Sequence, residues 1–248
     1  MSATLVLLPG LNNTGAVWAE VATRLETNGT VCHTPTLAAL PDVDALARQM
    51  LEGTSGSLHL VGFSFGGYVA LAAAAMAPER TTALSLIGTT PYADTAEERE
   101  RRLVAARRVN AEPDRYEDLI AAGEATAFHP DSLDDVSLLA RRRAMVRAYG
   151  PDRFLAHQQA AADRPDRSHV LAGLTARRIP VRFASGADDH VVPLHRQCEA
   201  AHRFGAHVHL VPNAGHLVPL EQPDALADWL DKSARISPHA EPDGDNSQ

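Results

Sequence analysis

The sequence predicts an α/β protein that has a mostly parallel, doubly wound sheet of about six strands and an inserted block of helices. Short apolar runs alternate with segments of helical pattern over residues 1–90. The alternation stops over residues 91–173 and resumes over residues 174–236. Strands that alternate with helices along a chain form a parallel sheet through right-handed crossovers. The simplest arrangement is one α/β core, made of the first and third segments, that carries a helical insertion.

The individual elements are read from apolar runs and their borders. Residues Thr4–Leu8 form a continuous apolar run that ends at Pro9-Gly10, which is typical of a strand buried in a parallel sheet. Further strands are expected at residues 29–34, 58–61, 83–87, 181–184 and 207–211, and helices at residues 16–26, 42–53, 68–77, 194–204 and 223–234. The Arg-rich helical segment between the two halves is too long to be an unstructured loop in a compact domain.

Composition limits the class of protein. Of the 248 residues, 45% are hydrophobic, as in a globular protein, and the net charge of −8 argues against a nucleic-acid-binding surface. The longest early apolar run, Leu5–Leu8, is too short to span a bilayer and lacks the features of a signal peptide, so we expect a cytoplasmic protein with no membrane partner. Residues 237–248 combine proline and glycine with acidic and polar residues, and we expect them to be disordered. The sequence predicts no particular oligomeric state.

The cysteines and histidines give no sign of a metal site. Cys32 and Cys198 are too few for a disulfide framework, and we expect two free thiols in a reducing compartment, with a single bridge between them as the alternative. His207 and His209 lie two apart on one face of a predicted strand, but no third ligand is apparent. We therefore predict no metal and no cofactor.

A candidate nucleophile follows the predicted strand at residues 58–61. The segment Gly62-Phe63-Ser64-Phe65-Gly66-Gly67 has the pattern G-x-S-x-G between a strand and a helix. At such a tight, strained turn the residues two before and two after the serine are expected to face each other, so both must be glycine. The start of the following helix adds a positive dipole and free N–H groups. The alternative is a glycine-rich turn without chemistry, and the strand and helix around Ser64 favour the nucleophile.

A serine hydroxyl needs a base to take its proton, and two later loops supply candidates. His216 follows the predicted strand at residues 207–211, which places it at the same edge of the sheet as Ser64. Asp188 and Asp189 follow the strand at residues 181–184. Either carboxylate could hold the far nitrogen of His216 and stabilise an imidazolium, and their positions alone do not separate them.

The turn after the first strand offers a site for a negatively charged oxygen. Gly10 lets the backbone turn beneath the reacting centre, so the backbone N–H groups of Leu11 and Phe65 are candidate donors to a tetrahedral oxyanion. The alternative is a plain Pro-Gly turn. The presence of Ser64 and His216 favours the oxyanion hole.

Together these segments resemble the α/β-hydrolase superfamily over most of the chain, from Thr4 to about Ala234. The resemblance rests on Gly62–Gly67 as the nucleophile elbow, Gly186–Pro193 as the acid loop, and Asn213–Leu217 with Glu221-Gln222-Pro223 as the segment of the catalytic histidine. In this family the acid usually comes three residues after the glycine and four before the proline, which selects Asp189 over Asp188. The resemblance also implies that residues 91–173 form a mobile helical cap over the pocket.

The chain departs from the family pattern in three places. Pro9-Gly10 replaces the usual His-Gly, which keeps the backbone donors and removes a supporting histidine. The first two strands of the family look absent, because the chain begins at the strand that normally comes third. His33–Leu37 replaces a common Asp- and Gly-containing stretch. A serine nucleophile argues against the haloalkane dehalogenase and epoxide hydrolase branches, which need a carboxylate.

The expected activity is hydrolysis of a small, mostly hydrophobic carboxylic ester, thioester or lactone through an acyl-serine. Ser64, Asp189 and His216 are the expected catalytic residues, and a small molecule is the only expected partner. One alternative uses the same residues for C–C bond hydrolysis, acyl transfer or lyase chemistry. The other is a small-molecule binder without catalysis.

Side chains of the insertion give weaker indications. Arg141, Arg142, Arg143 and Arg147 could attract an acidic substrate, but a solvated helix face is the favoured interpretation. The pairs Glu97–Arg101 and Glu98–Arg102 have the spacing of ion pairs within a helix. Phe128, Tyr149 and Phe154 are expected to pack the insertion rather than face the pocket.

Overall fold

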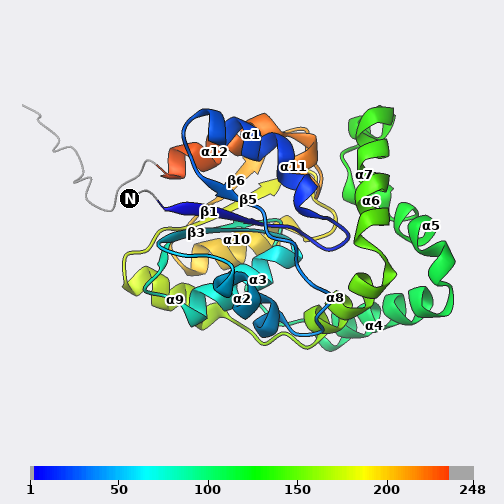
Figure 1. The fold of residues 1–248 in the computed structure, drawn as a ribbon, viewed down its shortest axis with the longest axis horizontal. Coiled ribbons are helices and arrows are strands. Elements are labelled where there is room, and N and C mark those ends of the chain that lie inside the picture. Colours follow the sequence, from blue (N-terminus) through cyan, green and yellow to red (C-terminus); the bar gives the residue numbers. More distant parts are fainter. Residues whose placement is uncertain (1–2, 235–248) are drawn as a thin grey trace, which may run out of the picture.

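The computed structural model describes residues 3–234, and its centre is one open sheet of six parallel strands (Figure 1). The strand order is β2-β1-β3-β4-β5-β6. The strands are β1 (Thr4–Leu8), β2 (Cys32–His33), β3 (Leu58–Phe63), β4 (Thr81–Ile87), β5 (Val181–Gly186) and β6 (Val208–Val211). The predicted fold class is confirmed. The predicted disordered tail, residues 237–248, lies outside the described residues.

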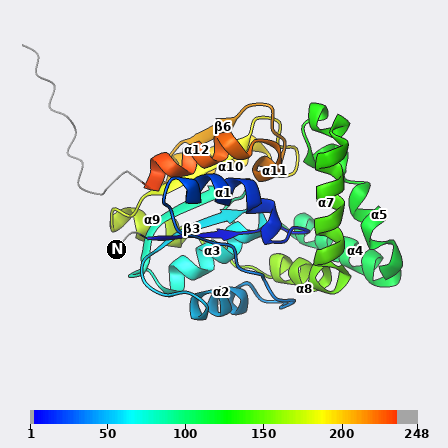
Figure 2. The same cartoon turned by 45° about the horizontal axis from the view of Figure 1, so that its top comes forward.

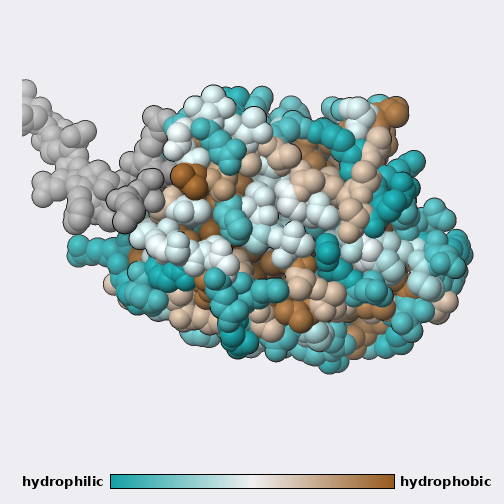
Figure 3. Space-filling view, in the orientation of Figure 1, coloured by the Kyte–Doolittle hydropathy of each residue, from teal (hydrophilic) through white to brown (hydrophobic). Residues whose placement is uncertain are grey.

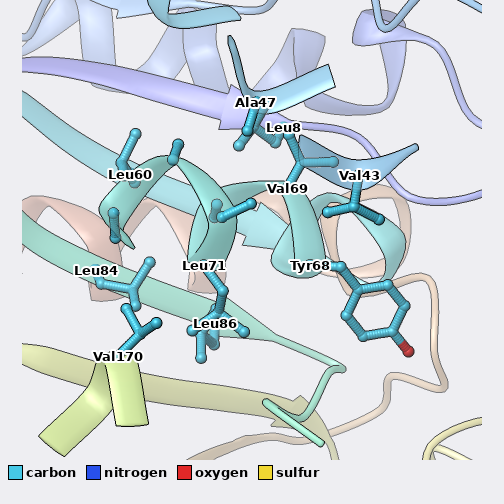
Figure 4. Packing of buried hydrophobic residues seen from close by; sticks show 14 of the residues in the cluster. Leu8, Val43, Ala47, Leu60, Tyr68, Val69, Leu71, Leu84, Leu86 and Val170 are labelled. Carbon is cyan, nitrogen blue, oxygen red and sulfur yellow. The ribbon is translucent and has the colours of Figure 1, made fainter. Parts of the chain in front are cut away.

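Helices cover both faces of the sheet (Figures 1 and 2). One face carries α2 (Val43–Glu52), α3 (Phe65–Met76), α9 (Ser168–Ala176) and α10 (Leu194–Arg203), and the other carries η1 (Gly15–Trp18), α1 (Ala19–Thr27), α11 (Val218–Glu221) and α12 (Pro223–Ala234). Alternate residues of a strand face opposite sides, so Val6 and Leu8 join one buried cluster while Leu5 and Leu7 join the other. Figure 4 shows the first cluster, in which Val69 and Leu71 of α3 pack among strand and helix side chains.

Several elements differ from their predicted bounds by one to three residues, and two of these differences have a plain physical reason. The strand expected at residues 29–34 is only two residues long, because it lies at the sheet edge and pairs with β1 at Leu5↔Cys32 and Val6↔His33 alone. The helix expected at residues 68–77 begins three residues earlier, at Phe65. The turn at Ser64 is so tight that the helix starts at the very next residue.

The remaining helices lie between β4 and α9, and they are called the insertion from here on. They are α4 (Ala96–Ala111), η2 (Pro113–Arg115), α5 (Tyr116–Ala121), α6 (Glu124–Ala127), η3 (Pro130–Asp134), α7 (Val136–Tyr149) and α8 (Pro151–Ala162). They gather at the end of the sheet toward which the strands run (Figure 1). Part of this group has a core of its own, which includes Tyr116, Tyr149 and Phe154. In contrast, α9 packs on the sheet through Val170, Leu171 and Leu174.

Two predictions about charged side chains of the insertion are wrong. Glu97 and Arg101 do pair, but Glu98 does not bind Arg102. Glu98 instead caps the start of α4, where its Oε2 accepts from the N–H of Thr95 at 2.8 Å, and it pairs with Arg196. The Nε of Arg102 donates to Asp94 at 2.6 Å. The carboxylate of Glu98, which the i,i+4 spacing predicted to pair with Arg102, is used instead to cap the helix.

The second wrong prediction concerns Arg142, which does not belong to a solvated helix face. Its neighbours Arg141, Arg143 and Arg147 are exposed, whereas Arg142 is buried. The aromatic residues Phe128, Tyr149 and Phe154 are all buried, but Phe128 packs in the cluster beneath α1 and α12 and not with the insertion. Tyr149 and Phe154 lie in the separate core, and the expectation that none of the three faces the pocket is wrong for Phe154. Phe154 also lines a cavity described below.

The surface and the helices give no sign of a membrane-spanning segment. Over residues 3–234, none of the helices has both the length and the apolar character needed to cross a bilayer. The face drawn in Figure 3 is a mosaic in which hydrophobic residues are scattered among hydrophilic ones. The thiols of Cys32 and Cys198 are free.

Candidate active site

Ser64 occupies a strained turn between β3 and α3. Its backbone has φ 51° and ψ −117°, a conformation that non-glycine residues rarely adopt and that persists only where the surroundings enforce it. Two backbone hydrogen bonds hold the turn, from the N–H of Ser64 to the carbonyl of Ile87 at 2.8 Å and from the N–H of Gly67 to the carbonyl of Ser64 at 2.9 Å. The hydroxyl is thereby presented at the carboxyl edge of the sheet.

Close backbone approach explains the glycines around Ser64, although not quite as the sequence suggested. A Cβ atom on Gly62 would lie 2.6 Å from the carbonyl oxygen of Gly66, so these two residues do meet across the turn. The tightest neighbours of Gly66 itself are the carbonyl oxygens of Leu8 and, at 2.7 Å, Pro9. Gly66 is therefore required because the first turn of α3 passes over the end of β1.

The structure brings Ser64, His216 and Asp189 into one hydrogen-bonded chain. The Nε2 of His216 lies 2.9 Å from the Oγ of Ser64, and its Nδ1 lies 2.9 Å from the Oδ2 of Asp189. A carboxylate only accepts, so Nδ1 carries the proton and Nε2 is free to accept from the hydroxyl. Asp188 is half-buried and its Oδ2 lies 3.6 Å from the Nε2 of His129, so among the two acids it is Asp189 that binds His216.

Asp189 is held in its charged form although it is 5% exposed. Burial is the largest single influence and raises its pKa, but the charge and hydrogen bond of His216 and two backbone N–H groups together lower the pKa below its ordinary value. Those N–H groups belong to Val191 and Val192, each 2.9 Å from the Oδ1 of Asp189. A buried, charged carboxylate stabilises an imidazolium on its partner histidine.

The loop that carries His216 is bound to the insertion. The backbone N–H of His216 donates to the carbonyl of Ala127 at 2.8 Å. The carboxylate of Glu221 accepts from the N–H groups of both Gly215, at 2.9 Å, and His129, at 2.6 Å. Burial raises the pKa of Glu221, while these hydrogen bonds oppose the shift. The sequence predicted Glu221 only as part of a family motif and not as a residue that binds the His216 loop. Its position five residues after His216 was the one feature of the sequence that could have indicated this role.

The turn after β1, residues Gly10–Asn13, lies directly beside Ser64. A Cβ on Gly10 would lie 2.9 Å from the ring of Phe63 and 3.1 Å from the Cβ of Ser64, so a side chain here would crowd both residues. The N–H groups of Leu11 and Phe65 have no acceptor within the described part of the chain, and both residues line the same cavity as Ser64. Unpaired backbone donors beside a hydroxyl are the kind of group that can stabilise an oxyanion.

A cavity of about 350 Å³ opens at Ser64 and His216. Its lining comes from the sheet edge and from α4, α5, α6, α7 and α8 of the insertion. Apolar side chains such as Tyr68, Leu119 and Phe154 line it together with the charged side chains of Arg142 and Glu124. The charged side chains were not expected from the prediction of a mostly hydrophobic substrate.

The histidines considered for a metal have a different environment. Among residues 3–234, no three His, Cys, Asp or Glu side chains are grouped in a way that could hold a metal ion. The ring of His209 stacks on Trp229, with 5.9 Å between ring centroids. Packing therefore accounts for His209.

Comparison with known proteins agrees with this architecture. The model of the alpha/beta hydrolase family matches residues 5–229. The structure is similar to a thermophilic esterase from Thermogutta terrifontis (TM-score 0.84, 23% identity, 95% of this chain and 90% of that one). It is also similar to an enol-lactonase from Burkholderia xenovorans LB400 (0.77, 19%, 94% and 91%) and a bromoperoxidase from Bacillus anthracis (0.78, 19%, 93% and 91%). No curated protein matches the sequence significantly. With a family model that spans nearly the whole of the described fold, this chain belongs to the alpha/beta hydrolase family.

Proposed function

We propose that the protein is a serine hydrolase that cleaves a small carboxylic ester, thioester or lactone. The observation that carries this proposal is the hydrogen-bonded chain from Ser64 through His216 to Asp189. Ser64 and His216 line a cavity that is large enough for a small molecule. The names of two structures with the same fold, an esterase and an enol-lactonase, are in keeping with ester and lactone bonds as targets.

The reaction follows from the positions of these groups. The Oγ of Ser64 attacks the carbonyl carbon while its proton passes to the Nε2 of His216, and Asp189 stabilises the imidazolium that forms. The carbonyl oxygen becomes an oxyanion and accepts hydrogen bonds from the N–H groups of Leu11 and Phe65. When the tetrahedral intermediate collapses, the alcohol or thiol takes the proton from His216. Water then attacks the acyl-serine, with His216 as its base, and releases the acid and free Ser64.

The insertion is proposed to act as the cap of this active site. Helices α4 to α8 contribute most of the lining that does not come from the sheet edge, including Leu119, Ile120 and Phe154. A wall of this kind excludes water from the acyl group and limits substrate size. A cavity of about 350 Å³ is at the small end of the usual range for ligand pockets, which supports a small substrate.

Labelling with a fluorophosphonate probe followed by peptide mapping tests the assignment. Wild-type protein is expected to react at Ser64, while Ser64→Ala and His216→Ala react weakly or not at all. Ser55→Ala, at an exposed serine in the loop before β3, serves as the matched control and should label like wild type. Equal labelling of Ser64→Ala would reject the assignment. Labelling at Ser64 without hydrolysis of p-nitrophenyl esters would point to C–C cleavage or acyl transfer by the same residues.

A further inference from the structure

We propose that Arg142 of α7 is a positioning residue that fixes the Gly10–Asn13 turn, so that the insertion holds in place one of the two oxyanion donors. This inference rests on the proposed function, because it concerns the N–H of Leu11 as a donor. It assigns to the insertion a part in the chemistry that goes beyond covering the cavity.

The Gly10–Asn13 turn has little to hold it from within. A single backbone hydrogen bond closes it, from the N–H of Asn13 to the carbonyl of Gly10 at 3.2 Å. Asn12 sits at φ 59°, a left-handed conformation that asparagine adopts more readily than other non-glycine residues. Pro9 has no N–H and no polar side chain, and Gly10 has no side chain. The residues that precede Leu11 therefore cannot anchor the turn by side-chain hydrogen bonds.

Arg142 supplies an anchor from 130 residues away in the sequence. Its Nη1 donates to the backbone carbonyl of Asn12 at 2.6 Å and to the Oδ1 of Asn13 at 2.9 Å. The side chain of Asn13 in turn donates through Nδ2 to the carbonyl of Leu11 at 2.7 Å. Hydrogen bonds from a charged donor are stronger than neutral ones, and chains of them reinforce one another. The peptide groups on either side of Asn12 are thus tied to one guanidinium.

A second helix of the insertion adds to this anchor. The hydroxyl of Tyr116, in α5, donates to the Oδ1 of Asn12 at 3.0 Å. The side chain of Asn12 is therefore bound by α5, while its carbonyl is bound by α7. Two helices of the insertion converge on one residue of the turn.

The environment of Arg142 shows that its hydrogen bonds are directed at this turn. The side chain is buried, at 5% exposure for the residue, and among residues 3–234 no carboxylate lies within 4.0 Å of it. Its Nε has no partner within the same residues. The charge of Glu124, which lines the same cavity, acts on Arg142 from beyond ion-pair distance. A buried cation without a direct ion pair is expensive to maintain, and an apolar residue would fill the same space at lower cost. The bonds to Asn12 and Asn13 are what an apolar residue could not provide.

The experiment compares Arg142→Met with Arg143→Met, the exposed arginine next to it on α7, in hydrolysis of p-nitrophenyl acetate. Losing an oxyanion donor lowers kcat by about 10² to 10³, so a donor that is misplaced but present is expected to lower kcat by about 10- to 100-fold. KM should change little, so that the loss lies in kcat. Arg143→Met should behave like wild type.

Two further measurements separate positioning from general damage. Guanidinium ion at millimolar concentration should restore part of the kcat of Arg142→Ala and should not raise that of Arg143→Ala. The effects of Arg142→Met and Asn13→Ala should combine to less than their product in the double variant, because both act through one hydrogen-bonded chain. If thermal unfolding shows that Arg142→Met has lost its fold, Asn13→Ala with Arg142→Lys takes its place in the comparison.

The outcomes distinguish this inference from the proposed function. Wild-type kcat in Arg142→Met or in Asn13→Ala overturns the inference, as does a loss that lies wholly in KM. In either case Ser64→Ala would still abolish hydrolysis if the proposed function is right. Unchanged hydrolysis by Ser64→Ala overturns the proposed function, and with it the basis for the role of Arg142.

Discussion

On the sheet side of the cavity the chain segments approach one another so closely that side chains are excluded, whereas on the insertion side long side chains bridge the gap. A Cβ on Gly66 would meet the carbonyl of Pro9 at 2.7 Å, and one on Gly10 would meet the Cβ of Ser64 at 3.1 Å. On the insertion side, Arg142 reaches Asn12 across 130 residues of sequence. Backbone packing fixes the position of Ser64, and side-chain hydrogen bonds from the insertion fix the position of the neighbouring turn.

A buried histidine illustrates the insertion side. His157 of α8 donates through Nε2 to the carbonyl of Ala38 at 2.7 Å and accepts at Nδ1 from the hydroxyl of Tyr149 at 2.5 Å. Its ring stacks on Phe65, with 4.6 Å between centroids. His157 and its partner Tyr149 are not among the residues that line the cavity, whereas His216 and its partner Ser64 are. His157 therefore supports the residue after Ser64 from behind the cavity wall.

The largest expected effect tests the sheet side through its two adjacent acids. Asp189→Asn should lower kcat by about 10⁴, because an amide at this place favours the wrong tautomer of His216. Asp188→Asn should stay within about threefold of wild type, since Asp188 is half-buried beside His129 and Asp189 is the acid that binds His216. Steady-state kinetics with p-nitrophenyl acetate measures both. The reverse ranking would show that the carboxylate in the structure is not the one that acts.

Adding one methyl group to the sheet side should have the next largest effect. In Gly66→Ala the new Cβ would press on the carbonyls of Leu8 and Pro9, and overpacking of this kind destabilises by about 1–3 kcal/mol. Gly173→Ala in α9 is the matched control, because no atom lies within 4 Å of its Cβ position. It should raise the free energy of unfolding by about 0.4–1 kcal/mol. Urea unfolding would contradict the account if the two variants were equally stable.

The third prediction compares the two sides through the pH dependence of stability. Burial, the main cause in each case, lowers the pKa of His59 in the sheet and of His157 in the insertion from 6.5 to about 4. Each histidine binds a proton more readily in the unfolded chain than in the folded one. Its contribution to the free energy of unfolding is therefore fully present above pH 6.5 and is lost as the pH falls toward 4. At pH 5 the loss is about 2 kcal/mol for each histidine.

Urea unfolding at pH 7.5 and pH 5.0, with His59→Gln and His157→Gln beside wild type, measures this loss. If sheet and insertion unfold together, each variant should remove about half of the pH effect from a single transition. If they unfold separately, His157→Gln should alter only one of two transitions. No pH dependence in wild type between 7.5 and 5.0 would contradict the pKa shifts of both residues.

The sheet side could be predicted from the sequence because backbone constraints leave marks on it. Gly62 and Gly66 flank Ser64 at a fixed spacing, and the order of strands places His216 at the same edge. Family spacing was needed to choose between two neighbouring carboxylates, because both follow the same strand. The length of β2 could not be read from composition, since it depends on how much of β1 remains unpaired at the sheet edge.

The side-chain contacts of the insertion could hardly be predicted from the sequence. Arg142 lies in a run of three arginines, and only the packing of α7 decides which of them is buried. The partners of these side chains lie far away in the sequence, as for Glu221 and His129, which are 92 residues apart. Glu98 could either cap the start of α4 or pair with Arg102 on the same helix, and in the structure it caps the helix. Side-chain pairs at such distances become visible only when the fold is known.

The carboxylate of Glu221 has a practical consequence for chimeras between members of this family. It belongs to the core by its place in the sequence, yet it needs the N–H of His129 in the insertion, and the His216 loop needs the carbonyl of Ala127. An insertion grafted from a relative must present a donor and an acceptor at those two places. Grafts that match only the length of the exchanged segment would leave a buried carboxylate short of a hydrogen bond beside the His216 loop.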